Sequence, residues 1–147
     1  MSTWLARARR MTIIDYVTAV EVMSLVVWIE LALKVMPFSR LLQRLSRPHS
    51  PSPAVPDVQR LGRFVMVAYD VLPLPTTCLR RSLVLHALLT RRGAPSRFCL
   101  GVARNGASLE AHAWVECEGV TTDASLAPFS ELQTPSQFTP TSEPSHV

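Results

Sequence analysis

The sequence predicts an α+β fold in which a central helix packs on an antiparallel sheet, with an N-terminal helical arm. Residues 57–92 contain two helix-like stretches, and the second is apolar almost all the way round. Residues 98–123 alternate between apolar and polar side chains and include Asn105-Gly106, a strong hairpin signal. A chain of 147 residues is long enough to bury a core as one domain.

The composition is that of a globular protein, with 48% hydrophobic and 18% charged residues. The formal net charge of +4 comes almost entirely from arginine, since Lys34 is the only lysine. The arginines occur in scattered pairs without interleaved aromatic residues, which favours solvated helix faces over a nucleic-acid surface. A modest basic surface could still attract an acidic peptide.

The cysteine count and the apolar segments predict a cytoplasmic protein. Three cysteines are too few for a disulfide framework, which favours a reducing compartment. No CxxC or His-x-x-x-His pair supplies metal-ligand spacing, and no cofactor is expected. The apolar run 22–29 lies between Glu21 and Glu30, far short of the roughly 20 residues of a membrane span. The basic residues near the N-terminus are not followed by a signal-peptide cleavage site.

The N-terminal arm is predicted to comprise residues 1–45. Residues 15–36 read as a helix that is apolar on more than one face, so it is either buried or meets a partner or a membrane surface. Residues 38–45 read as a short amphipathic helix. The proline-rich segment 46–56 cannot continue a helix and is predicted to link the arm to the rest of the chain.

The remaining chain is predicted to form a core over 57–127 and a partly ordered tail over 128–147, which is rich in Pro, Ser and Thr. Asp57 is expected to cap a helix that ends at Val71. Thr76 or Thr77 can cap the central helix.

The central helix is expected to run from Cys78 to Arg92 and to stop at Gly93. Three strands should follow it: 98–103, 109–117 and 120–123, with turns at Asn105-Gly106 and Glu118-Gly119.

Cys78 is the candidate nucleophile. Thiols attack as thiolates, and a helix N-terminus contributes only about 0.3–1 kcal/mol to a nearby anion. An imidazolium about 4 Å away is worth up to about 4 kcal/mol at an effective dielectric near 20. A cysteine at the start of a helix therefore needs a histidine partner.

His112 is the candidate base. His49 lies in the linker and His146 in the tail, while His86 lies about 12 Å along the same helix as Cys78 at ~1.5 Å per residue. His86 is therefore expected to be a core or supporting residue. His112 lies in the middle of a predicted strand and shares its face with Trp114.

Asp123 is the candidate acid that orients the imidazole. If Glu118-Gly119 is a two-residue turn, Asp123 pairs opposite Trp114 and lies diagonal to His112. Glu116 shares the face of His112 but lies about 13 Å along the strand at ~3.3 Å per residue.

The other two cysteines are weaker candidates for the nucleophile. In a simple Asn105-Gly106 hairpin, Cys99 would lie opposite His112, but it has no helix N-terminus and buried strand cysteines are common. Cys117 is expected to be structural. The backbone N–H of Cys78 is expected to be one oxyanion donor.

The residues Cys78-Leu79-Arg80-Arg81-Ser82 and Ala111-His112-Ala113-Trp114-Val115-Glu116, with Arg92-Gly93 and Leu100-Gly101-Val102 between them, resemble the lasso-peptide B2 proteins. These are transglutaminase-like, papain-like cysteine proteases of ribosomal peptide biosynthesis. The resemblance covers about 60–125 well and is less specific in the N-terminal arm.

The resemblance implies a leader peptidase that frees the N-terminal amine of a core peptide. Cys78 would be the nucleophile, His112 the base and then the acid, and Asp123 the orienting acid. A separate B1 protein would recognise the leader, and an asparagine-synthetase-like, ATP-dependent cyclase would form the macrolactam. Two alternatives stay open: a transglutaminase-like acyl transfer on the same triad, and a non-catalytic chaperone for the precursor.

Overall fold

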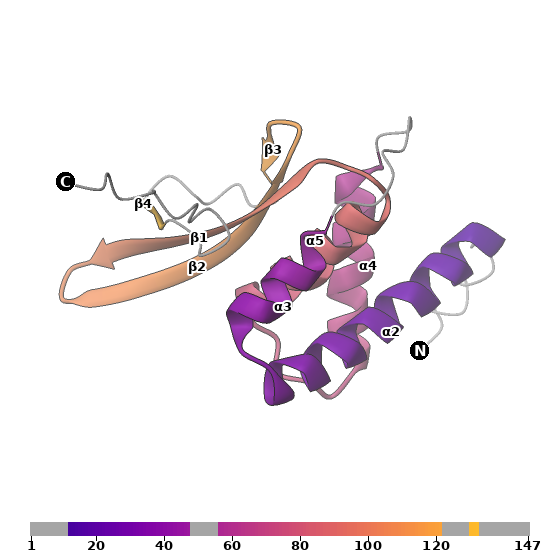
Figure 1. The fold of residues 1–147 in the computed structure, drawn as a ribbon, viewed down its shortest axis with the longest axis horizontal. Coiled ribbons are helices and arrows are strands. Elements are labelled where there is room, and N and C mark those ends of the chain that lie inside the picture. Colours follow the sequence, from indigo (N-terminus) through magenta and orange to yellow (C-terminus); the bar gives the residue numbers. More distant parts are fainter. Residues whose placement is uncertain (1–11, 48–55, 122–129, 133–147) are drawn as a thin grey trace, which may run out of the picture.

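The central helix, α5 (Cys78–Arg91), packs between three other helices and an antiparallel sheet (Figure 1). The computed structural model describes residues 12–47, 56–121 and 130–132. The other helices are α2 (Ile13–Val35), α3 (Phe38–Leu45) and α4 (Val58–Val71). Within the described residues the sheet has the order β3-β2-β1-β4, from β1 (Ser96–Asn105), β2 (Ser108–Cys117), β3 (Val120–Thr121) and β4 (Ser130–Leu132). The predicted α+β class, with a helix on an antiparallel sheet, is confirmed.

The local sequence of α5 fixes both of its ends. The Thr77 side chain accepts a hydrogen bond from the backbone N–H of Arg80, so Thr77 is the N-cap. Gly93 follows the last turn with φ +70°, a left-handed conformation that favours glycine. All residues from Ser82 to Thr90 are buried, because α2, α3 and α4 cover one side of the helix and β1 and β2 the other.

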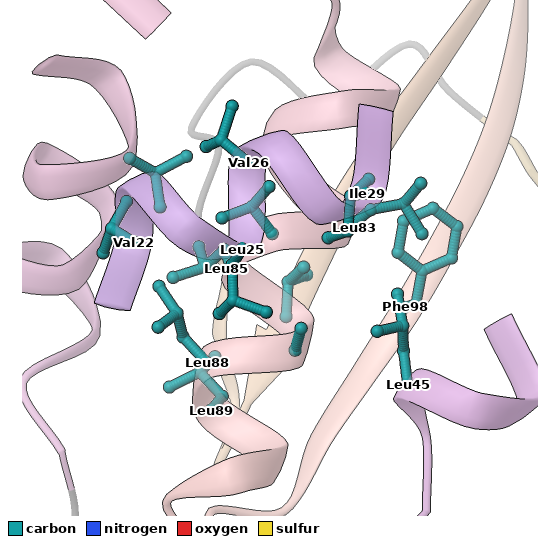
Figure 2. Close-up of a cluster of buried hydrophobic side chains, with 14 of the residues drawn as sticks. Val22, Leu25, Val26, Ile29, Leu45, Leu83, Leu85, Leu88, Leu89 and Phe98 are labelled. Carbon is teal, nitrogen blue, oxygen red and sulfur yellow. The ribbon is translucent and has the colours of Figure 1, made fainter. Parts of the chain in front are cut away.

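The main apolar core lies between α2 and α5. In Figure 2, side chains of α2 face those of α5, and Leu45 from α3 and Phe98 from β1 complete one end. The labelled core residues of the two helices are Val22, Leu25, Val26, Ile29, Leu83, Leu85, Leu88 and Leu89. The predicted arm therefore supplies α2 and α3 to the core that holds the central helix. The predicted boundaries at 45, 56 and 127 stay predictions.

Helix α2 is buried on one side and exposes apolar side chains on the other. A capping box between Thr12 and Asp15 begins the helix. By length and composition it could cross a membrane, but its inner side chains pack in the core. The exposed apolar side chains of α2 are Ile13, Ile14, Tyr16, Val17, Val20, Val27, Trp28, Leu31 and Val35. We call this set the outer face of α2.

The hairpin between β1 and β2 differs from the predicted one. Asn105 pairs with Ser108, so Gly106 and Ala107 form the turn. Gly106 has φ +60° and Ala107 does not have positive φ, the pattern of a turn that needs glycine only at its first central position. Because the turn moves by one residue, the register moves by two.

Gly101 therefore lies opposite His112, and Cys99 lies opposite Trp114. The predicted pairing of Cys99 with His112 is wrong for this reason. The tip of the hairpin projects beyond the helices (Figure 1), which accounts for the exposure of the residues around it.

The second predicted turn is confirmed. Cys117 pairs with Val120, and both Glu118 (φ +50°) and Gly119 (φ +78°) are left-handed. Asp123 lies outside the described residues, as does almost all of the predicted tail.

Candidate active site

Cys78 is the first residue of α5 and is half-buried. Thr77, immediately before it, holds the backbone N–H of Arg80, so the first helical turn is fixed around the thiol. The thiol is free, with no disulfide. A cysteine at a helix N-terminus is placed where the helix dipole favours a thiolate.

His112 lies on β2, half-buried, with its ring stacked on Trp114 at 6.3 Å between centroids. The next residue, Ala113, is buried, and its carbonyl accepts a hydrogen bond of 3.0 Å from the Ser82 hydroxyl. Ser82 is one turn after Cys78 on the same face of α5. The helix face of the thiol is thus joined directly to the strand segment that carries the imidazole.

Cys78 and His112 line one cavity of about 440 Å³. Its walls come from α4, the first two turns of α5, β2 and β3. The other lining residues are Val58, Gln59, Gly62, Arg63, Val65, Met66, Arg81, Ser82, Leu85, Ala113, Val120 and Thr121. The structure therefore brings together the predicted nucleophile and the predicted base, which are 34 positions apart in the sequence.

The predicted acid, Asp123, lies outside the described residues, and its role stays a prediction. The two-residue turn on which its predicted register depends is present. Glu116 is engaged elsewhere: its carboxylate accepts hydrogen bonds from Arg97 (2.7 Å) and from the Trp114 indole (3.2 Å). The Arg97 guanidinium, followed by the indole, lowers the pKa of Glu116. Glu116 thus ties β1 to β2.

The other two cysteines are not placed for catalysis. Cys99 is 0% exposed and Cys117 is 2% exposed, and neither lines the cavity. Burial, followed by the charge of Glu118, raises the pKa of Cys117. Of the three cysteines, Cys78 is the one in the cavity. Within the described residues, no group of three or more His, Cys, Asp and Glu side chains could hold a metal ion.

His86 is a core residue, as predicted. It is 3% exposed, and its ring nitrogens lie 2.9 Å from the hydroxyls of Ser46 and Ser96. The ring also contacts Phe98, with centroids 6.1 Å apart. Burial lowers the pKa of His86 to about 4, so it is neutral at physiological pH. His86 therefore joins α3, α5 and β1.

An ion pair that was not predicted from the sequence holds the start of α5. Glu30 of α2 is buried, and its carboxylate lies 2.9 Å from Nε of Arg80, two residues after Cys78. Arg80 also donates to the carbonyl of Pro75, and Tyr69 donates weakly to Glu30 at 3.5 Å. Burial, and then the Glu30 charge, raise the pKa of Tyr69.

Two sequence signals could have revealed these supports. Glu30 is an acid at the edge of an apolar helical run, where an unpaired charge would be costly. Ser82 is a small polar residue four positions after Cys78, on the same helix face.

A family model described as the transglutaminase-like superfamily matches residues 22–134. No curated protein and no solved structure matches the chain. The match begins within α2, continues through the central helix and the sheet, and includes both Cys78 and His112. That superfamily generally contains cysteine proteases and acyltransferases, whose chemistry needs a thiol and a base in one cleft. Because the match covers most of the chain, this protein belongs to the transglutaminase-like superfamily.

Proposed function

We propose that this protein is a cysteine peptidase that acts through Cys78 and His112. The observation that supports the proposal is that both residues line one cavity, Cys78 at a helix N-terminus and His112 on a strand that is hydrogen-bonded to that helix. In the first step the sulfur attacks the scissile carbonyl carbon, and His112 holds the thiol proton.

The same imidazole then gives that proton to the leaving amine as the C–N bond breaks, which leaves a thioester on Cys78. In the second step His112 takes a proton from water, the water oxygen attacks the thioester, and the proton returns to the sulfur. Asp123 is proposed to orient the imidazole, and the backbone N–H of Cys78 to bind the developing oxyanion.

The narrower proposal is a leader peptidase of lasso-peptide biosynthesis. The motif around Cys78 and the motif around His112, which resemble those of the lasso-peptide B2 proteins, support it. The substrate would be the leader–core junction of a precursor peptide. A separate B1 protein would present the leader, and an ATP-dependent cyclase would close the ring on the released amine.

The test is to incubate the full chain with a precursor peptide and a B1 protein, and to read the product masses. Free leader and free core are expected, and Cys78→Ala should abolish their formation. A product in which the leader acyl group is joined to an added amine would instead identify an acyltransferase. Cleavage that survives in Cys78→Ala, or a precursor held intact by both proteins, would refute the peptidase.

The outer face of α2 is the proposed docking surface for the B1 protein. Its apolar side chains lie on one side of a helix whose other side is fixed in the core. Removing residues 1–45 would also remove core, so surface substitutions are the better test. Val20→Glu and Leu31→Glu should weaken capture of the B1 protein, whereas Val67→Glu on the exposed side of α4 should not. Equal capture by all variants would exclude this surface.

A further inference from the structure

The described residues that line the cavity of Cys78 carry positive charge and no carboxylate. Arg63 from α4 and Arg81 from α5 line it, and no aspartate or glutamate is among the described residues of its walls. Arg81 is three positions after Cys78, so it lies on the same side of the helix as the thiol. Two positive side chains thus belong to the wall of the cavity, Arg81 half-buried and Arg63 exposed.

Neither guanidinium has a carboxylate partner among the described residues, in contrast to four other arginines of the fold. Those arginines form ion pairs: Arg60 with Asp15, Arg80 with Glu30, Arg92 with Glu21 and Arg97 with Glu116. Arg81 lies 2.8 Å from the sulfur of Met66, a neutral thioether that offsets little charge. A guanidinium that lines a cavity, and that no carboxylate of the described residues pairs with, suits the carboxylate of a ligand.

The wall beside Arg63 has room for such a ligand. Gly62 lies in the interior of α4 and lines the cavity, and a Cβ added there would meet nothing within 4 Å. No packing contact of the fold explains a glycine at that position, where helix propensity disfavours it. Val65 and Leu85 give the same cavity apolar surface, which suits the methylene stem of a long acidic side chain.

We propose that Arg63 and Arg81 bind an acidic side chain of the peptide substrate, close to the bond that Cys78 attacks. This proposal rests on the proposed function, because it assumes that the ligand is a peptide whose carbonyl carbon Cys78 attacks. It adds a chemical class of substrate: peptides with a glutamate or aspartate near the scissile bond.

Alkylation of Cys78 in the native full chain tests whether Arg63 and Arg81 attract a carboxylate to the thiol. This experiment does not require a known substrate. Iodoacetate and iodoacetamide form the same kind of S–C bond with loss of iodide, but only the first carries a carboxylate. Cys99 and Cys117 are buried, so the reaction in the native state is at Cys78, which peptide mapping checks. The ratio of the two rate constants is the readout, because a changed thiolate fraction affects both reagents equally.

The wild-type ratio is expected to exceed that of glutathione several-fold. Arg63→Gln and Arg81→Gln should each lower it about two- to fivefold, and the double variant should approach glutathione. Arg91→Gln is the matched control, because it removes the same charge about 20 Å away at the other end of α5, beyond the Debye length. A wild-type ratio equal to that of the double variant, or an equal fall in Arg91→Gln, would overturn the proposal.

A cleaved peptide then separates a side-chain carboxylate from a terminal one. Replacing the acidic residue near the scissile bond by its amide should lower kcat/KM about tenfold in the wild type and have little effect in the double arginine variant. Amidating the peptide C-terminus should change nothing, and a loss there would assign the site to a terminal carboxylate instead. Cys78-dependent cleavage that is indifferent to acidic residues would refute this inference and leave the peptidase standing.

Discussion

His86 lies on the central helix, and His112 lies on a strand that is hydrogen-bonded to that helix. The two histidines nevertheless have very different surroundings. His86 is part of the helix, fully enclosed, with both ring nitrogens against serine hydroxyls. His112 comes from β2 and lies at a cavity that also holds Cys78. A general base needs access to the substrate and a pKa near the working pH. The core around His86 blocks access of a substrate and lowers the pKa of the imidazole. Burial and hydrogen-bond partners, rather than residue type, therefore decide which histidine can act as a base.

The largest expected effect is on catalysis. His112→Asn should lower turnover about 10²–10⁴-fold with little change in Tm, because it removes the base from a half-buried position. His86→Leu should do the reverse, lowering Tm while the rate per folded molecule stays the same. Turnover of the precursor peptide and thermal unfolding measure the two effects. Full activity in His112→Asn would contradict the proposed role of His112 as the base.

The second prediction concerns the pH dependence of stability. The pKa of His86 is lowered to about 4 in the folded state from an unfolded value near 6.5, so the unfolded chain binds the proton more tightly. The contribution of neutral His86 is therefore fully present above about pH 6.5 and is lost as the pH falls toward 4, by up to roughly 3 kcal/mol. Urea unfolding across this range measures it.

His86→Leu is the control for that titration, since it removes the group and should flatten this part of the profile. The same slope in the variant would show that another group is responsible.

The third prediction concerns the ion pair under the start of α5. Glu30→Gln should destabilise the fold by roughly 1–3 kcal/mol, because it leaves the guanidinium of Arg80 partly buried without a counter-charge. It should also reduce turnover, since Arg80 belongs to the helical turn of Cys78. Glu21→Gln, which opens the more exposed pair with Arg92 at the far end of α5, should cost less than 1 kcal/mol and leave turnover unchanged. Equal effects of both variants on turnover would contradict the positioning role of Glu30.

The smallest expected effect is that of Ser82→Ala. It removes one buried hydrogen bond to the carbonyl of Ala113, which is expected to cost about 1 kcal/mol. Because that bond joins the helix of Cys78 to the strand of His112, turnover should fall more than stability alone explains. Ser96→Ala offers a comparison, since it removes a hydroxyl partner of His86 instead and should affect stability only.

Much of the fold could be predicted from local sequence signals. Asp57 and Thr77 cap their helices as expected, because a short oxygen side chain satisfies a first-turn N–H wherever a helix begins. Gly93 ends α5 and Glu118-Gly119 makes the second turn, since both need left-handed backbone. The predicted turn of the first hairpin is wrong because Asn105-Gly106 and Gly106-Ala107 are both acceptable turns locally. Pairing along the whole of β1 and β2 selects between them.

The candidate site was predictable in its reactive residues but not in its surroundings. Cys78 and His112 were identified by elimination among three cysteines and four histidines. The arginines of the cavity looked like members of ordinary surface pairs, Arg80-Arg81 among them. Only the structure separates the two: Arg80 turns to Glu30, and Arg81 turns to the cavity.

By itself the sequence determined where helices and turns begin and end, because these depend on hydrogen bonds between neighbours along the chain. It also determined which cysteine starts a helix. The tertiary structure alone decided the hairpin register, the hydrogen-bond partners of His86 and the arginines that line the cavity. Each of these depends on which residues, far apart in the sequence, come into contact in the folded protein. Spacing along the chain does not determine those contacts.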